Sequence, residues 1–215
     1  MYVAIGMWPD IAYAVQHLSQ FTSNLSPAHW SAIKHVFRYL NRTHNYRITY
    51  GGRNSIPNLE GYSNADWGND DLDHKSISGY IFLFGNTPIS WASRKQCTVA
   101  VSTMEAEYMA ASLATCNAIW LRTLLTEIGL LQNKPTLVNI DNQSAIDFTK
   151  NQGSHSKSKH IDIQHHFMCE CLGDNSIIIE HCTSEDNLAN VFTKVLPCPA
   201  HERFTSCISL DSELN

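Results

Sequence analysis

The chain has 215 residues, 43% of them apolar, and a formal net charge of −5 at pH 7. This composition excludes a disordered, collagen-like or coiled-coil chain and predicts one sizeable domain plus a smaller piece. The apolar runs are too short to cross a bilayer and the N-terminus lacks a signal-peptide pattern, so we expect an intracellular protein that is neither membrane-bound nor secreted.

Residues 1–50 are predicted to form a two-helix segment. The first helix covers residues 9–21, where apolar residues recur at helical spacing after a proline. The second begins at Ser26 and Pro27, which supply a cap and a first helical position. Its polar side carries three basic residues, Lys34, Arg38 and Arg42. The Gly-rich, polar stretch 51–57 then indicates a linker and a domain boundary near residue 55.

Residues 58–196 are predicted to form an α/β domain. Three strands separated by turn residues suggest an antiparallel meander at residues 59–65, 79–84 and 88–92. The elements expected after them are a helix at 103–128, a strand at 136–140, helices at 143–150 and 158–172, a strand at 176–181 and a terminal helix at 186–195. Because crossovers lead to the last two strands, we expect a mixed five-stranded sheet with flanking helices, followed by a tail at 197–215.

Acidic residues on two of these elements point to chemistry. The long helix opens with Ser-Thr-Met-Glu-Ala-Glu-Tyr at residues 102–108, and Asp141 directly follows a buried strand. Within the helix, Glu105 has the capping-box spacing to Ser102, and Glu107 lies two residues further on. Carboxylates brought together from separate elements are what Mg²⁺ needs, and pairs of Mg²⁺ ions serve phosphodiester hydrolysis. The pattern therefore predicts a nuclease.

Eight short motifs carry a resemblance to a known family. They are Trp8-Pro-Asp-Ile-Ala-Tyr-Ala14, Tyr62-Ser-Asn-Ala-Asp-Trp67, Ser76-Ile-Ser-Gly-Tyr80, Ile89-Ser-Trp91, Ser102-Thr-Met-Glu-Ala-Glu-Tyr108, Asp141-Asn-Gln-Ser-Ala145, Lys159-His-Ile-Asp-Ile163 and Phe192-Thr-Lys194. In these motifs the chain resembles the C-terminal part of the Pol polyprotein of copia-type retrotransposons. The resemblance implies the end of a reverse transcriptase over residues 1–50 and a ribonuclease H domain from about 57 to 196. It also implies an RNA–DNA hybrid as substrate and the rest of the reverse transcriptase as partner.

The resemblance further implies two Mg²⁺ or Mn²⁺ ions held by four acids on the first strand, the long helix, the fourth strand and the terminal helix. Glu107 and Asp141 match two of the four positions, but the family's other two aspartates are replaced by Asn64 and Asn190. A carboxamide has no negative charge, so we expect weak metal binding and weak or absent cleavage. The chain thus resembles a degenerate ribonuclease H.

Several alternatives remain at this stage. Asp66 and Asp186 are the neighbours that would have to capture a displaced metal ion. A domain that binds nucleic acid without cleaving it, or the product of a pseudogene, also fits the two asparagines. No small-molecule cofactor is expected, and the resemblance implies a cytoplasmic particle or the nucleus as the location.

Two further sets of residues are candidate binding sites. The first set lies near the start of the second crossover helix and consists of Lys157, Lys159 and His160. Two interpretations stay open for it, namely contacts to the phosphates of the hybrid and an ordinary solvated loop. A zinc site has suitable residue types in His155, His160, His165, His166, Cys169 and Cys171. The absence of a Cys-x-x-Cys pair favours ordinary helix residues over zinc. We also expect Trp67, Trp91 and Trp120 to be core residues rather than stacking platforms.

Overall fold

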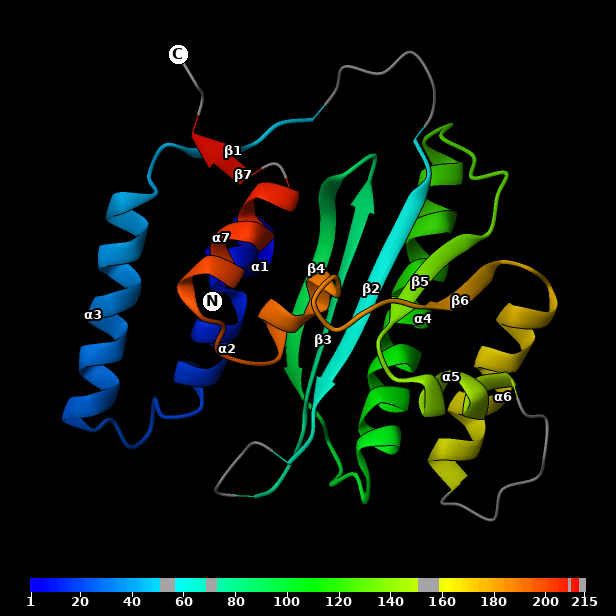
Figure 1. The fold of residues 1–215 in the computed structure, drawn as a ribbon, viewed down its shortest axis with the longest axis horizontal. Coiled ribbons are helices and arrows are strands. Elements are labelled where there is room, and N and C mark those ends of the chain that lie inside the picture. The colour runs from blue at the N-terminus through cyan, green and yellow to red at the C-terminus, as the bar shows by residue number, and fades with distance from the viewer. Residues whose placement is uncertain (51–56, 69–72, 151–158, 209, 213–215) are drawn as a thin grey trace.

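The computed structural model describes residues 1–50, 57–68, 73–150, 159–208 and 210–212 (Figure 1). At its centre lies a five-stranded sheet in the order β4-β3-β2-β5-β6. The strands are β2 (Leu59–Asp66), β3 (Ile77–Phe84), β4 (Thr87–Lys95), β5 (Thr136–Ile140) and β6 (Ile177–His181). β2, β3 and β4 pair antiparallel, whereas β5 is parallel to β2 and β6 is parallel to β5. The predicted mixed sheet is therefore confirmed.

β3 is buried on both sides, which explains its nearly continuous run of apolar residues. Tyr80 and Phe82 point into one hydrophobic cluster, and Ile81 and Leu83 into a second cluster across the sheet. Successive side chains of a strand point to opposite faces, so a strand covered on both faces cannot alternate with polar residues.

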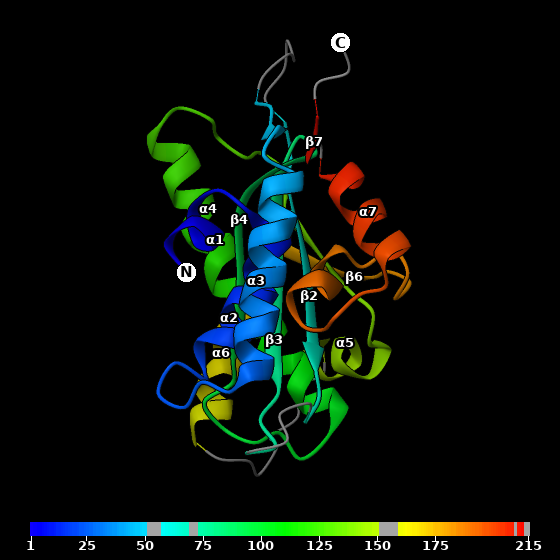
Figure 2. The same cartoon turned by 90° about the vertical axis from the view of Figure 1, so that its left-hand side faces the viewer.

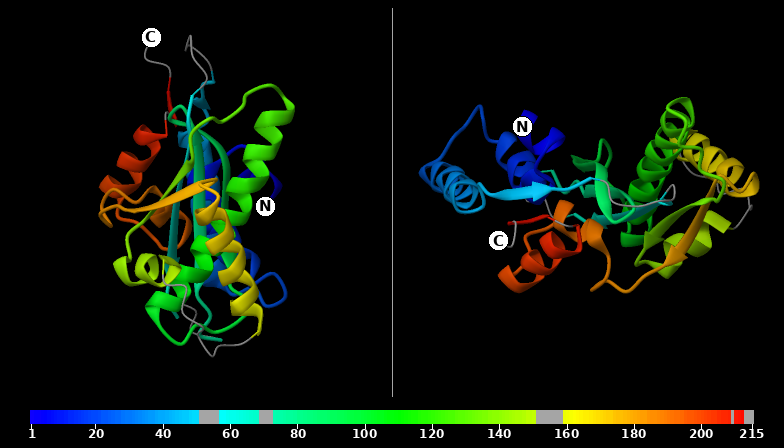
Figure 3. Two further views of the ribbon diagram at one scale, coloured as in Figure 1. Left: turned by 90° about the vertical axis from the view of Figure 1, so that its right-hand side faces the viewer. Right: turned by 90° about the horizontal axis from the view of Figure 1, so that it is seen from above.

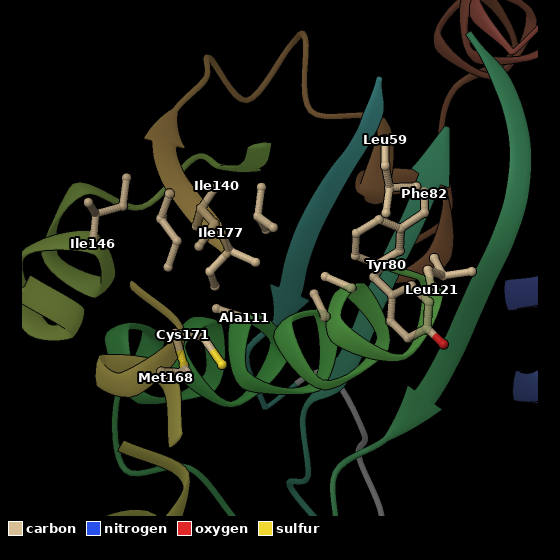
Figure 4. Packing of buried hydrophobic residues seen from close by; sticks show 14 of the residues in the cluster. Leu59, Tyr80, Phe82, Ala111, Leu121, Ile140, Ile146, Met168, Cys171 and Ile177 are labelled. Carbon is tan, nitrogen blue, oxygen red and sulfur yellow. The ribbon is translucent and has the colours of Figure 1, made fainter. Parts of the chain in front are cut away.

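One face of the sheet is covered by α4 (Thr103–Glu127) and α6 (Lys159–Gly173), with α5 (Gln143–Lys150) packed against both helices (Figure 3). Small residues on α4 let it approach the sheet closely, and they are Ala111, Ala114 and Ala118. Figure 4 shows this cluster, in which Phe82, Ile140 and Ile177 of three strands meet residues of α4 and α6. The core therefore lies between the sheet and these helices.

The start of α4 has the predicted cap. The Glu105 N–H donates to Ser102 Oγ at 3.2 Å. The Glu105 carboxylate in turn accepts from the Val101 N–H at 2.9 Å, one residue earlier than a standard capping box would have it. Glu105 thus caps the helix. Glu107, two residues further on, takes no part in this cap.

The other face of the sheet carries η2 (Leu188–Phe192) and α7 (Cys198–Cys207). The prediction of a regular helix over 186–195 is wrong, since only the short 3₁₀ helix η2 forms. Asn187 fixes where η2 begins, since its side chain accepts from the Ala189 N–H at 3.0 Å and donates to the Ser63 carbonyl at 2.9 Å. The Asn190 side chain donates to the Asn187 carbonyl at 3.0 Å, an acceptor that a regular α-helix would use for its own backbone. Beyond Pro197 the chain forms α7, which the sequence analysis did not predict.

Gly79 allows η2 to lie directly on β3. A Cβ atom at this position would come within 2.6 Å of Phe192 Cβ and 2.8 Å of Thr193 Cγ2. Real Cβ contacts are never this short, so a larger residue would push η2 away from the sheet. Gly79, the glycine of the Ser-Gly-Tyr motif, thereby determines how closely the segment that carries Asn190 packs against β3.

The N-terminal segment packs beside β4 and α7. It contains α1 (Tyr2–Gly6), η1 (Pro9–Ile11), α2 (Ala12–Ser19), α3 (Pro27–Arg42) and β1 (Tyr46–Ile48). β1 pairs antiparallel with β7 (Leu210–Ser212), so the strand that follows α3 lies beside the last described residues (Figure 1). The two predicted helices are confirmed as α2 and α3, although α2 is shorter than predicted. The predicted linker 51–57, with its division near residue 55, lies outside the described residues except for Pro57. The separate tail 197–215 remains a prediction.

The three tryptophans differ in their surroundings. Trp91 is buried, and its Nε1–H donates to the Ala4 carbonyl at 2.8 Å. Trp67 and Trp120 are 49% and 58% exposed, so the prediction that they are core residues is wrong. Within the described ranges, no helix has the length and hydropathy that a membrane span requires.

Candidate functional site

The four positions singled out in the sequence lie together at the carboxyl ends of β2 and β5, two inner strands of the sheet. Asn64 lies near the end of β2 and Asp141 directly follows β5, and because these strands are parallel their carboxyl ends meet. The Asn64 amide donates to Asp141 Oδ2 at 3.3 Å and to Asn190 Oδ1 at 3.2 Å. Glu107 reaches the same strand from α4, where its Oε2 accepts from the Ala65 N–H at 3.0 Å.

Asn64 is the centre of this arrangement. Its side chain is buried, and both ends of its amide are engaged, since Thr193 Oγ1–H donates to Asn64 Oδ1 at 3.3 Å. An ionised carboxylate has no hydrogen to donate, so it could not make the two bonds to Asp141 and Asn190. The hydrogen-bond network therefore depends on an amide at position 64.

Asn190 and Ser184 complete the network. The Asn190 amide donates to the Ser184 carbonyl at 2.6 Å and the Asn187 carbonyl at 3.0 Å. Ser184 Oγ–H donates to Asp141 Oδ2 at 2.7 Å. Ser184 and Thr193 were not singled out in the sequence. Thr193 belongs to the Phe-Thr-Lys motif and could have been suspected, whereas no pattern marks Ser184.

The electrostatics of the site centre on Glu107, which is 7% exposed. Burial raises the pKa of its carboxyl to about 8, and the nearby negative charge of Asp141 adds to this rise, while the Ala65 N–H and Lys194 act in the opposite direction. A carboxyl group with this pKa is largely protonated at neutral pH. Glu107 therefore contributes little negative charge to the site there.

The two neighbouring aspartates differ. Asp66 ends β2, and its charge adds to the rise in the pKa of Glu107, so it belongs to the electrostatic surroundings of the site. Asp186 precedes η2 and does not share a helix with Asn190, as the predicted helix over 186–195 would have required. Its carboxylate pairs with Arg203 of α7 at 2.5 Å and accepts from Thr183 at 2.8 Å, and these bonds lower its pKa.

The residues present do not fit two divalent cations. Mg²⁺ requires several oxygen ligands at about 2.0–2.1 Å and favours carboxylates. Here the NH₂ group of Asn64 points at the Asp141 oxygen that a cation would need. In the described part of the chain, no group of three or more His, Cys, Asp or Glu residues could hold a metal ion. The cluster is instead held together by its own hydrogen bonds.

The other predicted binding residues fall largely outside the described part of the chain. This applies to His155 and Lys157, and to the side chains of Lys159, His160 and His165. Of the remaining zinc candidates, His166 is exposed, Cys171 is buried in the hydrophobic core and Cys169 lies 3.7 Å from the Thr149 carbonyl. A cysteine packed among core residues such as Met168 is a small apolar residue rather than a ligand.

Similarity to known proteins extends over nearly the whole chain. No protein-family model matches it. The retrovirus-related Pol polyprotein from transposon TNT 1-94 of Nicotiana tabacum is 41% identical over 210 residues, which are 98% of this chain and 15% of that protein. Secreted RxLR effector protein 161 of Plasmopara viticola is 47% identical over 121 residues, which are 56% of this chain and 84% of the effector. The chain thus spans about 15% of the length of the Pol polyproteins it matches.

Solved structures share the fold at low sequence identity. The match to the foamy viral protease-reverse transcriptase dRH in complex with double-stranded DNA covers 91% of this chain and 31% of the viral chain, with a TM-score of 0.51 and 15% identity. Ribonuclease H1 structures are among the other matches. At such identities the likeness shows the arrangement of helices and strands and nothing about activity.

Proposed function

Because this chain belongs to the copia-type retrotransposon Pol polyproteins, we propose that it is their ribonuclease H domain, in a form in which two-metal cleavage of RNA–DNA hybrids is weak or lost. One observation carries the proposal. The amide of Asn64 donates hydrogen bonds into the centre of the site, to Asp141 and to Asn190, where a nuclease of this kind would need acceptors facing a cation.

The charge balance supports the same conclusion. Four ionised carboxylates would neutralise two divalent cations, whereas Glu107 and Asp141 supply at most two negative charges. The pKa of Glu107, raised to about 8, reduces that charge further at neutral pH. Mg²⁺ or Mn²⁺ would supply the activation of water and the neutralisation of the phosphate if it were bound. The ligands that remain are too few and too weakly charged to hold a pair of ions in fixed positions.

The partners we propose follow from the family. They are an RNA–DNA hybrid as ligand and the remainder of the reverse transcriptase, with the protein acting inside the cell, in a cytoplasmic particle or the nucleus. The Pol relatives that the chain matches are about seven times longer, so the proposal concerns this region alone.

The test is cleavage of a labelled RNA–DNA hybrid in Mg²⁺ or Mn²⁺. We expect the natural chain to cleave no faster than its Glu107→Gln variant, and the double variant Asn64→Asp, Asn190→Asp to recover cleavage. Thermal unfolding with and without Mg²⁺ gives a second readout. The transition of the natural chain should not move, whereas the double variant should be stabilised by the ion.

Three controls make the result interpretable. Adding Glu107→Gln to the double variant should abolish the recovered cleavage, which ties it to this site. Circular dichroism should show that each variant is folded. The proposal is wrong if the natural chain turns over hybrid and loses that activity on Glu107→Gln or Asp141→Asn.

A further inference from the structure

Charge is distributed very unevenly along the chain. Residues 11–59 contain five Lys or Arg and no Asp or Glu, whereas the rest of the chain contains ten Lys or Arg and twenty Asp or Glu. A strongly basic segment within an acidic protein is typical of a surface that meets a polyanion. The five basic residues are Lys34, Arg38, Arg42, Arg47 and Arg53.

Three of these cations form one row on α3. Lys34, Arg38 and Arg42 are spaced four residues apart, so they lie one above the other on the same side of the helix. At a rise of 1.5 Å per residue the row is about 12 Å long. All three residues are exposed, and none forms an ion pair with any residue that the structure describes. Their charge is therefore available to a partner.

α3 is held in a fixed rotation by Tyr39, which lies between Arg38 and Arg42 in sequence. The Tyr39 hydroxyl donates to the buried carboxylate of Asp10 at 2.5 Å. Its ring packs edge-on against His201 of α7, with 5.6 Å between the ring centroids. Because Tyr39 faces the body of the protein, the basic row cannot turn inward without breaking a buried hydrogen bond.

A groove of about 670 Å³ runs beside the row, between α3 and α7. Figure 2 shows this side of the molecule, with α3 in front and α7 to its right. Arg38 and Arg42 line one wall, and His201 and Thr205 line the other. Glu202 is the one acidic residue in the described lining of this groove. The charge on the described lining of the groove is therefore mostly positive.

We propose that the row Lys34, Arg38 and Arg42, with the adjoining groove, binds the phosphodiester backbone of a nucleic-acid duplex. A strand of duplex has one negative charge about every 3.4 Å, so about three to four phosphates lie along a 12 Å row. Arginine suits this role because its planar fork pairs with phosphate oxygens through two hydrogen bonds. The row lies on different elements from the four-residue site, so it anchors a duplex whether or not cleavage occurs there.

The proposal rests on the proposed function in one respect, which is that an RNA–DNA hybrid is the first duplex to test. Binding of a fluorescent 20-base-pair hybrid to the full chain is measured by anisotropy between about 50 and 300 mM salt, in EDTA so that no cleavage intervenes. A duplex DNA of the same sequence is the second probe. Because contacts to the backbone carry no sequence or sugar information, we expect both duplexes to bind.

The test variant replaces all three cations, Lys34→Ala, Arg38→Ala and Arg42→Ala. The matched control also removes three positive charges from exposed positions elsewhere, by Arg94→Ala, Lys134→Ala and Lys150→Ala. We expect the test variant to bind at least about tenfold more weakly at low salt, with a salt dependence of log K that is shallower by roughly 2.7, since each phosphate contact contributes about 0.9. The control should stay close to the natural chain.

Three results would overturn the proposal. One is equal binding and equal salt dependence of the natural chain and the test variant. Another is an equal loss in test variant and control, which would mean that net charge alone acts. The last is a folded natural chain that binds neither duplex, which would assign the row to an acidic protein partner instead. None of these depends on cleavage, so failure here and failure of the proposed function are separate outcomes.

Discussion

Two regions of the molecule use the same strand and helix in opposite ways. In the core, β2 and α4 contribute apolar side chains such as Leu59 and Ala111 to one hydrophobic cluster. A few residues away on the same two elements, Asn64 and Glu107 join a buried polar cluster. The core holds the fold whatever the cluster contains. Asn64 and Asn190 can therefore replace two aspartates of the family while the segments that carry them stay in place.

This comparison predicts that core substitutions cost much more stability than changes in the cluster. Phe82 is completely buried among residues of α4, and Phe82→Ala should lower the free energy of unfolding by about 3–5 kcal/mol, because the cavity cannot fill. Urea denaturation followed by circular dichroism measures this. Ile178→Ala, on the partly exposed side of β6, should cost far less. Equal losses at both positions would mean that the core does not dominate.

The sequence allowed much of the core to be predicted, because it depends on patterns that extend over many residues. The apolar run of β3 and the apolar stripe of α3 each repeat a local rule, and both elements were found. The pairing of β1 with β7 was missed, since each strand has only three residues and the two strands are far apart in the sequence. Neither strand carries enough pattern to be detected alone.

The second prediction concerns Glu107 and pH. Its pKa is raised from 4.5 to about 8 in the folded protein, so the folded state binds more protons than the unfolded state between these values. The stability from this group is therefore complete below about pH 4.5 and is lost as the pH rises through 8. Between pH 5 and pH 9 the natural chain should lose on the order of 2–4 kcal/mol more than the Glu107→Gln variant.

Urea denaturation at several pH values measures this difference, and Glu127→Gln, at an exposed position of the same helix, is the control. Parallel pH profiles for the natural chain and Glu107→Gln would show that Glu107 is ionised in the folded protein at neutral pH. In that case the site would carry more negative charge than we infer, and the argument against metal binding would weaken.

The candidate site was less predictable than the core, because it is made of single residues from distant segments. Resemblance to a family marked Asn64 and Asn190, but Ser184 contributes through one hydroxyl that no motif announces. The cap formed by Asn187 starts η2 two residues after Asp186, so the predicted position of Asp186 on a helix with Asn190 was wrong. Side-chain hydrogen bonds of Asn187 and Asn190 shape the backbone there, and the helix pattern of the sequence does not show them.

The smallest effect is expected at Asp186. Its carboxylate pairs with Arg203 at the surface, so Asp186→Ala should leave thermal unfolding nearly unchanged. In the variant Asn64→Asp, Asn190→Asp it should also leave the recovered cleavage unchanged. Arg203→Ala is the matched control for the loss of the pair. Loss of cleavage on Asp186→Ala alone would show that Asp186 reaches a metal ion in the restored site.

The pairing of β1 with β7 has a consequence for the order in which the molecule can be completed. On the ribosome, Tyr46–Ile48 emerges more than 160 residues before Leu210–Ser212. Until those last residues are synthesised, the early strand lacks its β7 partner. The segment that carries β1 is thus made before the five-stranded sheet but reaches its final position after it.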